Sequence, residues 1–275
     1  MSVTPLEIAA SAVQARQHIR QHIYQTPLIP AKKTGIKHGA RVFFKAENFQ
    51  LTVSFKLRGA MSKMSNHTGN KPLITASSGN HGIGSAQAAS VLHKSLTVVL
   101  PEQPSLPNER RLSRLASRSS STAQKRDRRS SMHRSSPRPA SPPGQATIGL
   151  EILEQCDHVD NAFVSMGGRW AHQWYRTYHL PTLAEGVAGG IDEDSTTFPL
   201  ASAVVDQVIE CNQVEIAAAL RSIAHDETMI VEGSDGLALA GFDKVAHQLG
   251  AETSIVLLCG ANIDGNTIKE VLYGS

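Results

Sequence analysis

Residues 45–60 read K-A-E-N-F-Q-L-T-V-S-F-K-L-R-G-A, and Lys56 lies near their centre between Phe55 and Leu57. An amine beside an aromatic side chain can be desolvated, which lowers its pKa and makes it a competent nucleophile toward a carbonyl group. The start of an amphipathic helix with one solvent-reaching lysine gives the same local pattern. The stretch by itself therefore leaves both interpretations open.

A second stretch combines a strand, a serine–glycine turn and the start of a helix. Residues 72–76 read P-L-I-T-A, S-S-G-N-H-G follows at 77–82, and an alanine-rich helix is expected at 83–92. Backbone N–H groups and the dipole at such a helix start form a site for an anion. An ordinary strand-to-helix turn with a side-chain cap is the alternative interpretation.

Together these stretches resemble the serine/threonine dehydratase family, whose members depend on pyridoxal phosphate, have fold type II and include serine racemase. The resemblance in the first stretch rests on these residues: Lys45, Glu47, Gln50, Ser54, Phe55, Lys56, Arg58, Gly59 and Ala60. It implies an α/β fold of the tryptophan synthase β-like type. The implied large domain comprises residues 1–47 and 144–275, and the small domain comprises 48–143, with the cofactor between them.

The resemblance also implies the cofactor, pyridoxal 5′-phosphate, and the roles of the residues around it. Lys56 is expected to form the internal Schiff base, beside Phe55, and Asn80 to contact the 3′ oxygen of the cofactor. In racemising members the residue at Ser78 protonates the opposite face, so Lys56 and Ser78 are the expected catalytic residues. The substrate carboxylate is expected on Ser77, Ser78, Gly79 and His81.

Two more stretches resemble the parts of the family that hold the cofactor phosphate and ring. Residues 162–168 read A-F-V-S-M-G-G, where the family continues with two more glycines that wrap the phosphate with backbone N–H groups. Here Gly167 and Gly168 are the matching cofactor-binding residues. The predicted strand at 254–258 ends in Cys259, where the family has a Ser or Cys facing the pyridine nitrogen. A neutral partner there limits carbanion delocalisation and suits elimination.

The chain departs from the family at several positions. Val53 stands where the family has glycine, and a β-branched residue is strained there if its φ is positive. Asp235 stands where a small apolar residue is usual. After Gly168 a helix, a strand and an acidic segment that binds a divalent cation in racemase-like members are absent. The spacing of His172 and His179 matches no metal site, so no bound metal is expected.

Residues 104–143 form the most unusual segment. They contain ten Lys/Arg and two Asp/Glu, a balance of +8, so the rest of the chain carries −5 of the total of +3. Their composition buries too little apolar surface to offset chain ordering, which predicts a disordered, disrupted segment of the small domain. Family-like sequence returns at residue 144, which is the pattern of translation in a shifted reading frame. A basic arm for nucleic acid is the alternative, but interleaved aromatic residues are absent.

The overall composition is that of an ordinary soluble protein. The chain has 275 residues and three cysteines without a CxxC pair, and we identify neither a secretory signal nor an apolar run of about 18 residues. We therefore expect a cytoplasmic protein without a membrane partner, and a homodimer if folded. Besides those above, strands are expected at 41–45, 96–100 and 204–209. Helices are expected from residue 5 to a break at 25–28, at 57–64 and at 214–225.

The chemistry implied by the resemblance is β-elimination from a small hydroxy amino acid. Lys56 removes the α-proton of L-serine or L-threonine, the hydroxyl leaves, and hydrolysis yields a 2-oxo acid and ammonia. Two alternatives stay open. One is an amino-acid (serine) racemase or a dehydratase of another 3-hydroxy amino acid, and the other is a catalytically dead product of a damaged reading frame.

Overall fold

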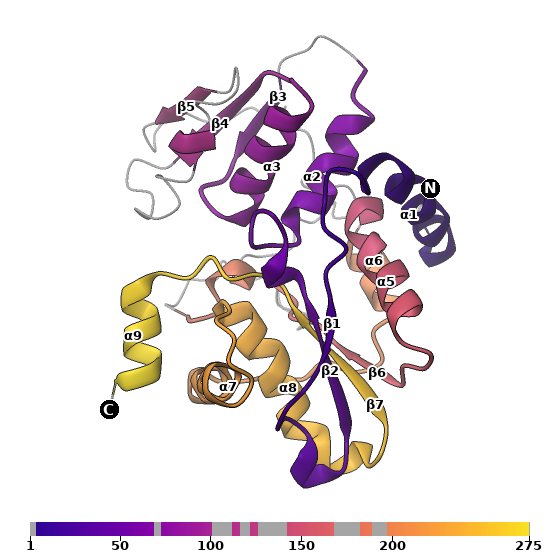
Figure 1. Cartoon of the computed structure of the whole chain (residues 1–275), viewed down its shortest axis with the longest axis vertical. Helices are drawn as coiled ribbons and strands as arrows, with labels where there is room; N and C mark the ends of the chain where they lie inside the picture. Colours follow the sequence, from indigo (N-terminus) through magenta and orange to yellow (C-terminus); the bar gives the residue numbers. More distant parts are fainter. Residues whose placement is uncertain are drawn as a thin grey trace. The chain divides into compact units, whose positions relative to one another are not determined.

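The computed structural model describes residues 4–68, 73–100, 112–115, 122–125, 142–167, 182–188 and 197–274. These residues form an α/β structure that divides into two compact units (Figure 1). Unit 1 comprises Met1–Pro5, Thr26–Asn48 and Ile152–Ser275, and unit 2 comprises Leu6–Gln25 and Phe49–Glu151.

Unit 1 is built on a four-stranded sheet of order β1-β2-β7-β6. Its strands are β1 (Leu28–Pro30), β2 (Arg41–Ala46), β7 (Thr253–Leu258) and β6 (Asn161–Phe163). β1 is antiparallel to β2, whereas β2 and β6 each pair with β7 in parallel. The sheet thus brings the carboxyl ends of three parallel strands to one edge, which is where open α/β sheets bind ligands.

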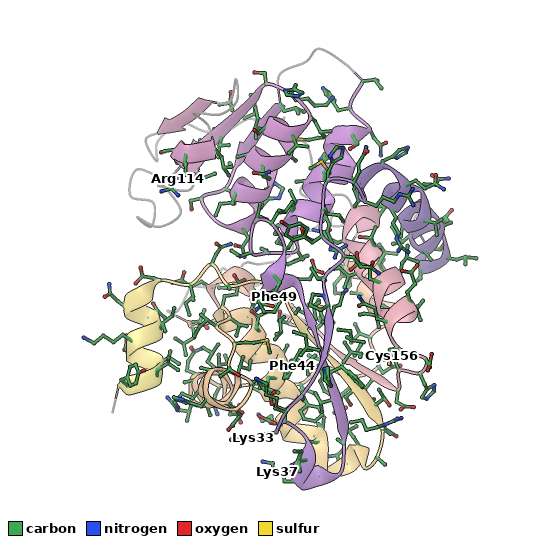
Figure 2. The ribbon with its side chains drawn as sticks, viewed as in Figure 1. Lys33, Lys37, Phe44, Phe49, Arg114 and Cys156 are labelled. Carbon is green, nitrogen blue, oxygen red and sulfur yellow. The ribbon has the colours of Figure 1, made fainter. Side chains whose placement is uncertain are left out.

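The core of unit 1 lies between this sheet and helices α7 (Gln213–Asp226) and α8 (Gly233–Leu249). Phe44 of β2 and Phe242 of α8 are both fully buried there, and Figure 2 labels Phe44 on its strand. Phe163 meets the ring of Phe242 edge to face, with 5.4 Å between the ring centroids. The remaining helices of unit 1 are α6 (Thr197–Ser202), α9 (Gly265–Tyr273) and 3-10 turns at Ile36–His38, Glu47–Phe49 and Glu185–Val187.

Unit 2 contains a parallel sheet of order β3-β4-β5. Its strands are β3 (Leu73–Ala76), β4 (Leu96–Leu100) and β5 (Thr122–Lys125), and its helices are α1 (Pro5–Ile19), α2 (Lys56–Ser65), α3 (Asn80–Val91) and most of α5 (Pro142–Gln155). α2 and α3 lie side by side in Figure 1. One apolar cluster joins α1, α2, α3 and β4 through Ile19, Leu57, Ile83 and Leu96.

The boundaries of the units differ from the predicted domain boundaries in two places. α1 after Pro5 lies in unit 2, because its Ile19 packs in the same apolar cluster as Leu57 of α2. The part of α5 up to Glu151 also lies in unit 2, because Arg58 of α2 pairs with Glu151. Both differences arise from contacts between residues far apart in the sequence.

The expectation of a strand at 204–209 is wrong. Residues 205–210 have no regular structure, and Val204, Val205 and Val208 are exposed. β-branched residues such as these valines favour a strand only where a neighbouring strand completes the hydrogen bonds. None of the strands in the described part of the chain pairs with this segment.

The segment 104–143 is partly described, and there the structure differs from the expected disorder. Residues 112–115 form a helical turn whose Leu112 is buried, and β5 pairs with β4 from Thr97↔Thr122 to Leu100↔Lys125. Backbone pairing of this kind needs no alternation of apolar side chains. The rest of 104–141, together with Gly168, His172 and His179, lies outside the described residues. No helix in the described part is long and apolar enough to span a membrane.

The loop before α2 contains a strained residue. Val53 has a φ of 51°, and its N–H closes a turn by donating to the carbonyl oxygen of Gln50 at 2.7 Å. A left-handed backbone at a β-branched residue places Cβ close to the following carbonyl and costs about 1–2 kcal/mol. The departure from glycine noted in the sequence therefore falls at a position with a positive φ.

We predict that glycine is more stable than alanine at position 53, the reverse of the usual order. Val53→Gly should have a free energy of unfolding about 1 kcal/mol above that of Val53→Ala, because only alanine keeps the Cβ that causes the strain. Denaturant unfolding measures both variants. At Leu51, whose φ is not positive, the matched Leu51→Gly and Leu51→Ala pair should show the usual order. The same order at both positions would contradict the assignment of strain.

Candidate active site

Lys56 is the first residue of α2. Its Nζ lies 4.5 Å from the centroid of the Phe55 ring, a cation–π arrangement. The Lys56 side chain is half-buried, and the backbone N–H of the same residue approaches the Ser54 hydroxyl at 3.4 Å. The amine is therefore partly desolvated by an aromatic ring and attached to the first residue of a helix.

Arg58 fixes the first turn of α2 two residues after Lys56. Its guanidinium group is fully buried and binds both carboxylate oxygens of Glu151 on α5, at 2.7 and 2.8 Å. The same group donates to the Thr147 hydroxyl at 3.2 Å. A bidentate, charge-assisted pair restricts both distance and orientation. It therefore holds α2 against α5.

Two glycines let neighbouring helices approach the backbone of α2. A Cβ on Gly84 of α3 would lie 3.0 Å from the Leu57 nitrogen and 3.1 Å from the Lys56 carbonyl carbon. A Cβ on Gly144 of α5 would lie 2.6 Å from the carbonyl oxygen of Arg58. Larger side chains at either position would displace the turn that carries Lys56.

The turn at 77–82 leads from β3 into α3, which begins at Asn80. Gly79 precedes the helix in an extended conformation and makes no side-chain capping bond. The backbone N–H groups of a helix start are suited to binding an anion. The Ser77 hydroxyl oxygen accepts a hydrogen bond from the Gly79 N–H at 3.3 Å. A Cβ on Gly82 would lie 2.0 Å from the backbone carbonyl oxygen of Ser77. The backbone of Gly82 therefore lies directly against that of Ser77, which leaves no room for a side chain at position 82.

His81 lies in the first turn of α3. Burial, and then the positive charges of Lys56 and Lys63, lower the pKa of His81 from 6.5 to about 4. The imidazole is therefore neutral at neutral pH and interacts electrostatically with the Lys56 amine. A neutral His81 can offer the substrate carboxylate a hydrogen bond but not a positive charge.

In unit 1 two predicted site residues follow strands of the sheet. Gly167 comes after β6, and a Cβ on it would lie 2.6 Å from the carbonyl oxygen of Val187. Cys259 directly follows β7, is 5% exposed, and has its Sγ 3.5 Å from the Ser165 hydroxyl. Gly168, the other residue predicted to bind phosphate, lies outside the described residues.

The predicted site residues therefore fall into two groups, one in each unit. The group in unit 2 comprises Phe55, Lys56, Ser77, Ser78, Gly79, Asn80 and His81, and the group in unit 1 comprises Gly167 and Cys259. Asp235 was noted in the sequence without a role, and Glu151 was not singled out there. Glu151 is the partner of Arg58, and Asp235 is the buried acceptor of the Cys259 N–H. A carboxylate at a position that is usually apolar was the signal for Asp235.

The chemistry of these groups fits pyridoxal phosphate. Lys56 has a half-buried amine that suits an aldehyde, and the backbone N–H groups at the start of α3 suit an anion. Gly167 lies where the Val187 backbone excludes a side chain. The prediction that each residue contacts a particular cofactor atom stays a prediction.

Comparison with known proteins defines the class. The family model described as "Pyridoxal-phosphate dependent enzyme" matches residues 19–173 and 166–260, and the chain belongs to this family. The two matched segments meet at 166–173, where the sequence loses its family-like glycines.

Individual relatives narrow the class. The chain is 29% identical to an L-threonine ammonia-lyase of Geobacter sulfurreducens, covering 94% of this chain and 76% of the relative. It is 26% identical to a serine racemase of Dictyostelium discoideum, covering 94% and 96%. The solved threonine deaminase isoform 2 of Solanum lycopersicum superposes with a TM-score of 0.82 at 21% identity, over all of this chain and 90% of that one. The predicted fold class and cofactor are confirmed at the level of the family.

We predict that the His81 ring titrates with a midpoint of about 4 in the folded protein. Because its pKa is lowered on folding, the unfolded state binds more protons between pH 4 and 6.5, so stability falls as the pH falls through that window. Histidine-ring NMR resonances, assigned with His81→Gln, measure the midpoint. Lys56→Met should raise it by removing a positive charge. A midpoint near 6.5 in the unsubstituted protein would contradict the burial of His81.

Proposed function

We propose that this chain is a pyridoxal-phosphate-dependent ammonia-lyase that converts L-threonine or L-serine to a 2-oxo acid and ammonia. The observation that carries the proposal is the placement of Lys56. Its amine lies over Phe55 at the start of a helix that is held by the buried Arg58–Glu151 pair. The similarity to a threonine ammonia-lyase supports the reaction type.

Lys56 has two tasks in this proposal. The cofactor, when bound, supplies an aldehyde and a conjugated ring that stabilises negative charge at Cα. The Lys56 amine would hold the cofactor through that aldehyde and, in the reaction, would accept the proton from the substrate Cα. A fixed first turn of α2 suits both tasks, because the same nitrogen must reach two neighbouring atoms.

The turn at 77–82 orients the substrate. The N–H groups at the start of α3 bind the substrate carboxylate, beside Ser77 and Ser78. The neutral His81 adds a hydrogen bond without a positive charge. Asn80, in the first turn of the same helix, would contact the 3′ oxygen of the cofactor. Cys259 offers the cofactor nitrogen a neutral partner, and Gly167 offers the phosphate its backbone N–H.

The shortened glycine stretch is expected to limit activity. Each charge-assisted hydrogen bond to the phosphate contributes about 1.5–3 kcal/mol, so the absence of two weakens cofactor binding by about two to four orders of magnitude. In the sequence, Arg169 and Trp170 stand where the resembling family has its two further phosphate-binding glycines.

The test compares Lys56→Ala with Lys63→Ala, a matched change in the same helix. With pyridoxal phosphate in excess, the parent and Lys63→Ala should develop a visible absorption band that borohydride bleaches. They should also form a 2-oxo acid from L-threonine or L-serine, slowly. Lys56→Ala should do neither. Rebuilding the four glycines and the missing segment should raise turnover.

Three outcomes would contradict the proposal. A band that survives Lys56→Ala would exclude Lys56 as the cofactor lysine. Full turnover without repair of the glycine stretch would contradict its expected effect. Formation of D-serine from L-serine without 2-oxo acid would show that the chain is a racemase and not a lyase.

A further inference from the structure

Asp235 is a fully buried carboxyl group in the first turn of α8. Its Oδ1 accepts the backbone N–H of Cys259, and its Oδ2 accepts those of Gly260 at 3.4 Å and Glu232 at 3.1 Å. Cys259 and Gly260 are the first two residues after β7. The carboxyl group therefore binds the backbone at the carboxyl end of a central parallel strand.

The neighbouring carboxyl group of Glu232 binds the next part of the same loop. Its Oε1 accepts the Ser234 hydroxyl at 2.8 Å, and its Oε2 accepts the N–H of Asn262 at 3.3 Å. The Glu232 N–H donates in return to the carbonyl oxygen of Gly260 at 3.0 Å. Residues 259–262 are thus held from one side by the start of α8.

This arrangement has an energetic cost that an apolar residue would avoid. Burial and the nearby Glu232 raise the pKa of Asp235, whereas the three backbone N–H groups act in the opposite direction. A small apolar side chain, usual at this position in the resembling family, offers the Cys259 and Gly260 N–H groups no acceptor. The Asp235 carboxyl group is therefore a feature of this chain, and it binds the N–H groups of Cys259 and Gly260.

The contact determines where the Cys259 side chain points. Cys259 is 5% exposed, and its Sγ lies 3.5 Å from the Ser165 hydroxyl. Since Asp235 binds the Cys259 N–H, the direction of the Cα–Cβ bond is fixed by that hydrogen bond together with β7. Loss of the acceptor removes a hydrogen bond from each of two buried N–H groups, which favours movement of the loop.

We propose that Asp235 is a positioning residue that fixes the backbone of Cys259 and Gly260 and thereby directs the Cys259 thiol. The consequence for catalysis rests on the proposed function, in which that thiol faces the cofactor nitrogen. The positioning itself is a property of unit 1 without cofactor.

The first measurement follows alkylation of Cys259 by iodoacetamide in the cofactor-free protein, read by mass spectrometry, with Cys156 and Cys211 replaced by serine. Asp235→Ala should speed alkylation by about tenfold or more, and Asp235→Asn, which keeps one acceptor oxygen, by less. Asp243→Asn, farther along the same helix, should leave the rate unchanged. Circular dichroism establishes that each variant is folded.

The second measurement is the absorption spectrum after addition of pyridoxal phosphate. Asp235→Ala and Cys259→Ala should shift the visible maximum in the same direction, whereas Asp243→Asn should not. An unchanged alkylation rate in a folded Asp235→Ala protein, or in Asp235→Asn if the alanine variant does not fold, would overturn the proposal. A Cys259→Ala spectrum identical to that of the parent would instead overturn the proposed role of the thiol, while the alkylation result still decides whether Asp235 positions it.

Discussion

The buried pair between Arg58 and Glu151 is the interaction on which the lysine-bearing half of the site depends. Arg58 is completely buried and Glu151 nearly so, so each charge has lost its water and requires the other. The pair joins α2 to α5 across 93 residues of sequence. Because Arg58 lies within one turn of Lys56, the pair fixes the backbone from which the Lys56 amine extends.

The two units use the same physical device at their predicted site residues. In unit 2 a carboxylate on α5 binds the turn that carries Lys56, and in unit 1 carboxyl groups on α8 bind the loop that carries Cys259. In both cases a buried carboxyl group accepts several hydrogen bonds, which is the condition for burying it. Each unit thus fixes the backbone that carries a predicted site residue, Lys56 in unit 2 and Cys259 in unit 1.

The sequence predicted the elements whose signals are local, and missed those that depend on distant partners. The serine–glycine turn at 77–82 and the start of α2 at Lys56 follow from residues within a few positions of each other. The expected strand at 204–209 is wrong because pairing depends on a neighbour that local pattern does not report. The same reason hid the link from Arg58 to Glu151 and the short strand β5. For Val53 the sequence predicted strain only if its φ is positive, and the structure supplied that φ.

A double-mutant cycle on Arg58 and Glu151 tests the central claim most directly. The account predicts that Arg58→Met and Glu151→Leu each lower the free energy of unfolding by about 3–5 kcal/mol, and that the double variant loses much less than their sum. Each single variant should also lose the borohydride-dependent labelling of Lys56. The exposed pair of Lys33 and Asp226 is the control, and its removal should change little. Additive losses at Arg58 and Glu151, with labelling of Lys56 retained in each single variant, would contradict the account.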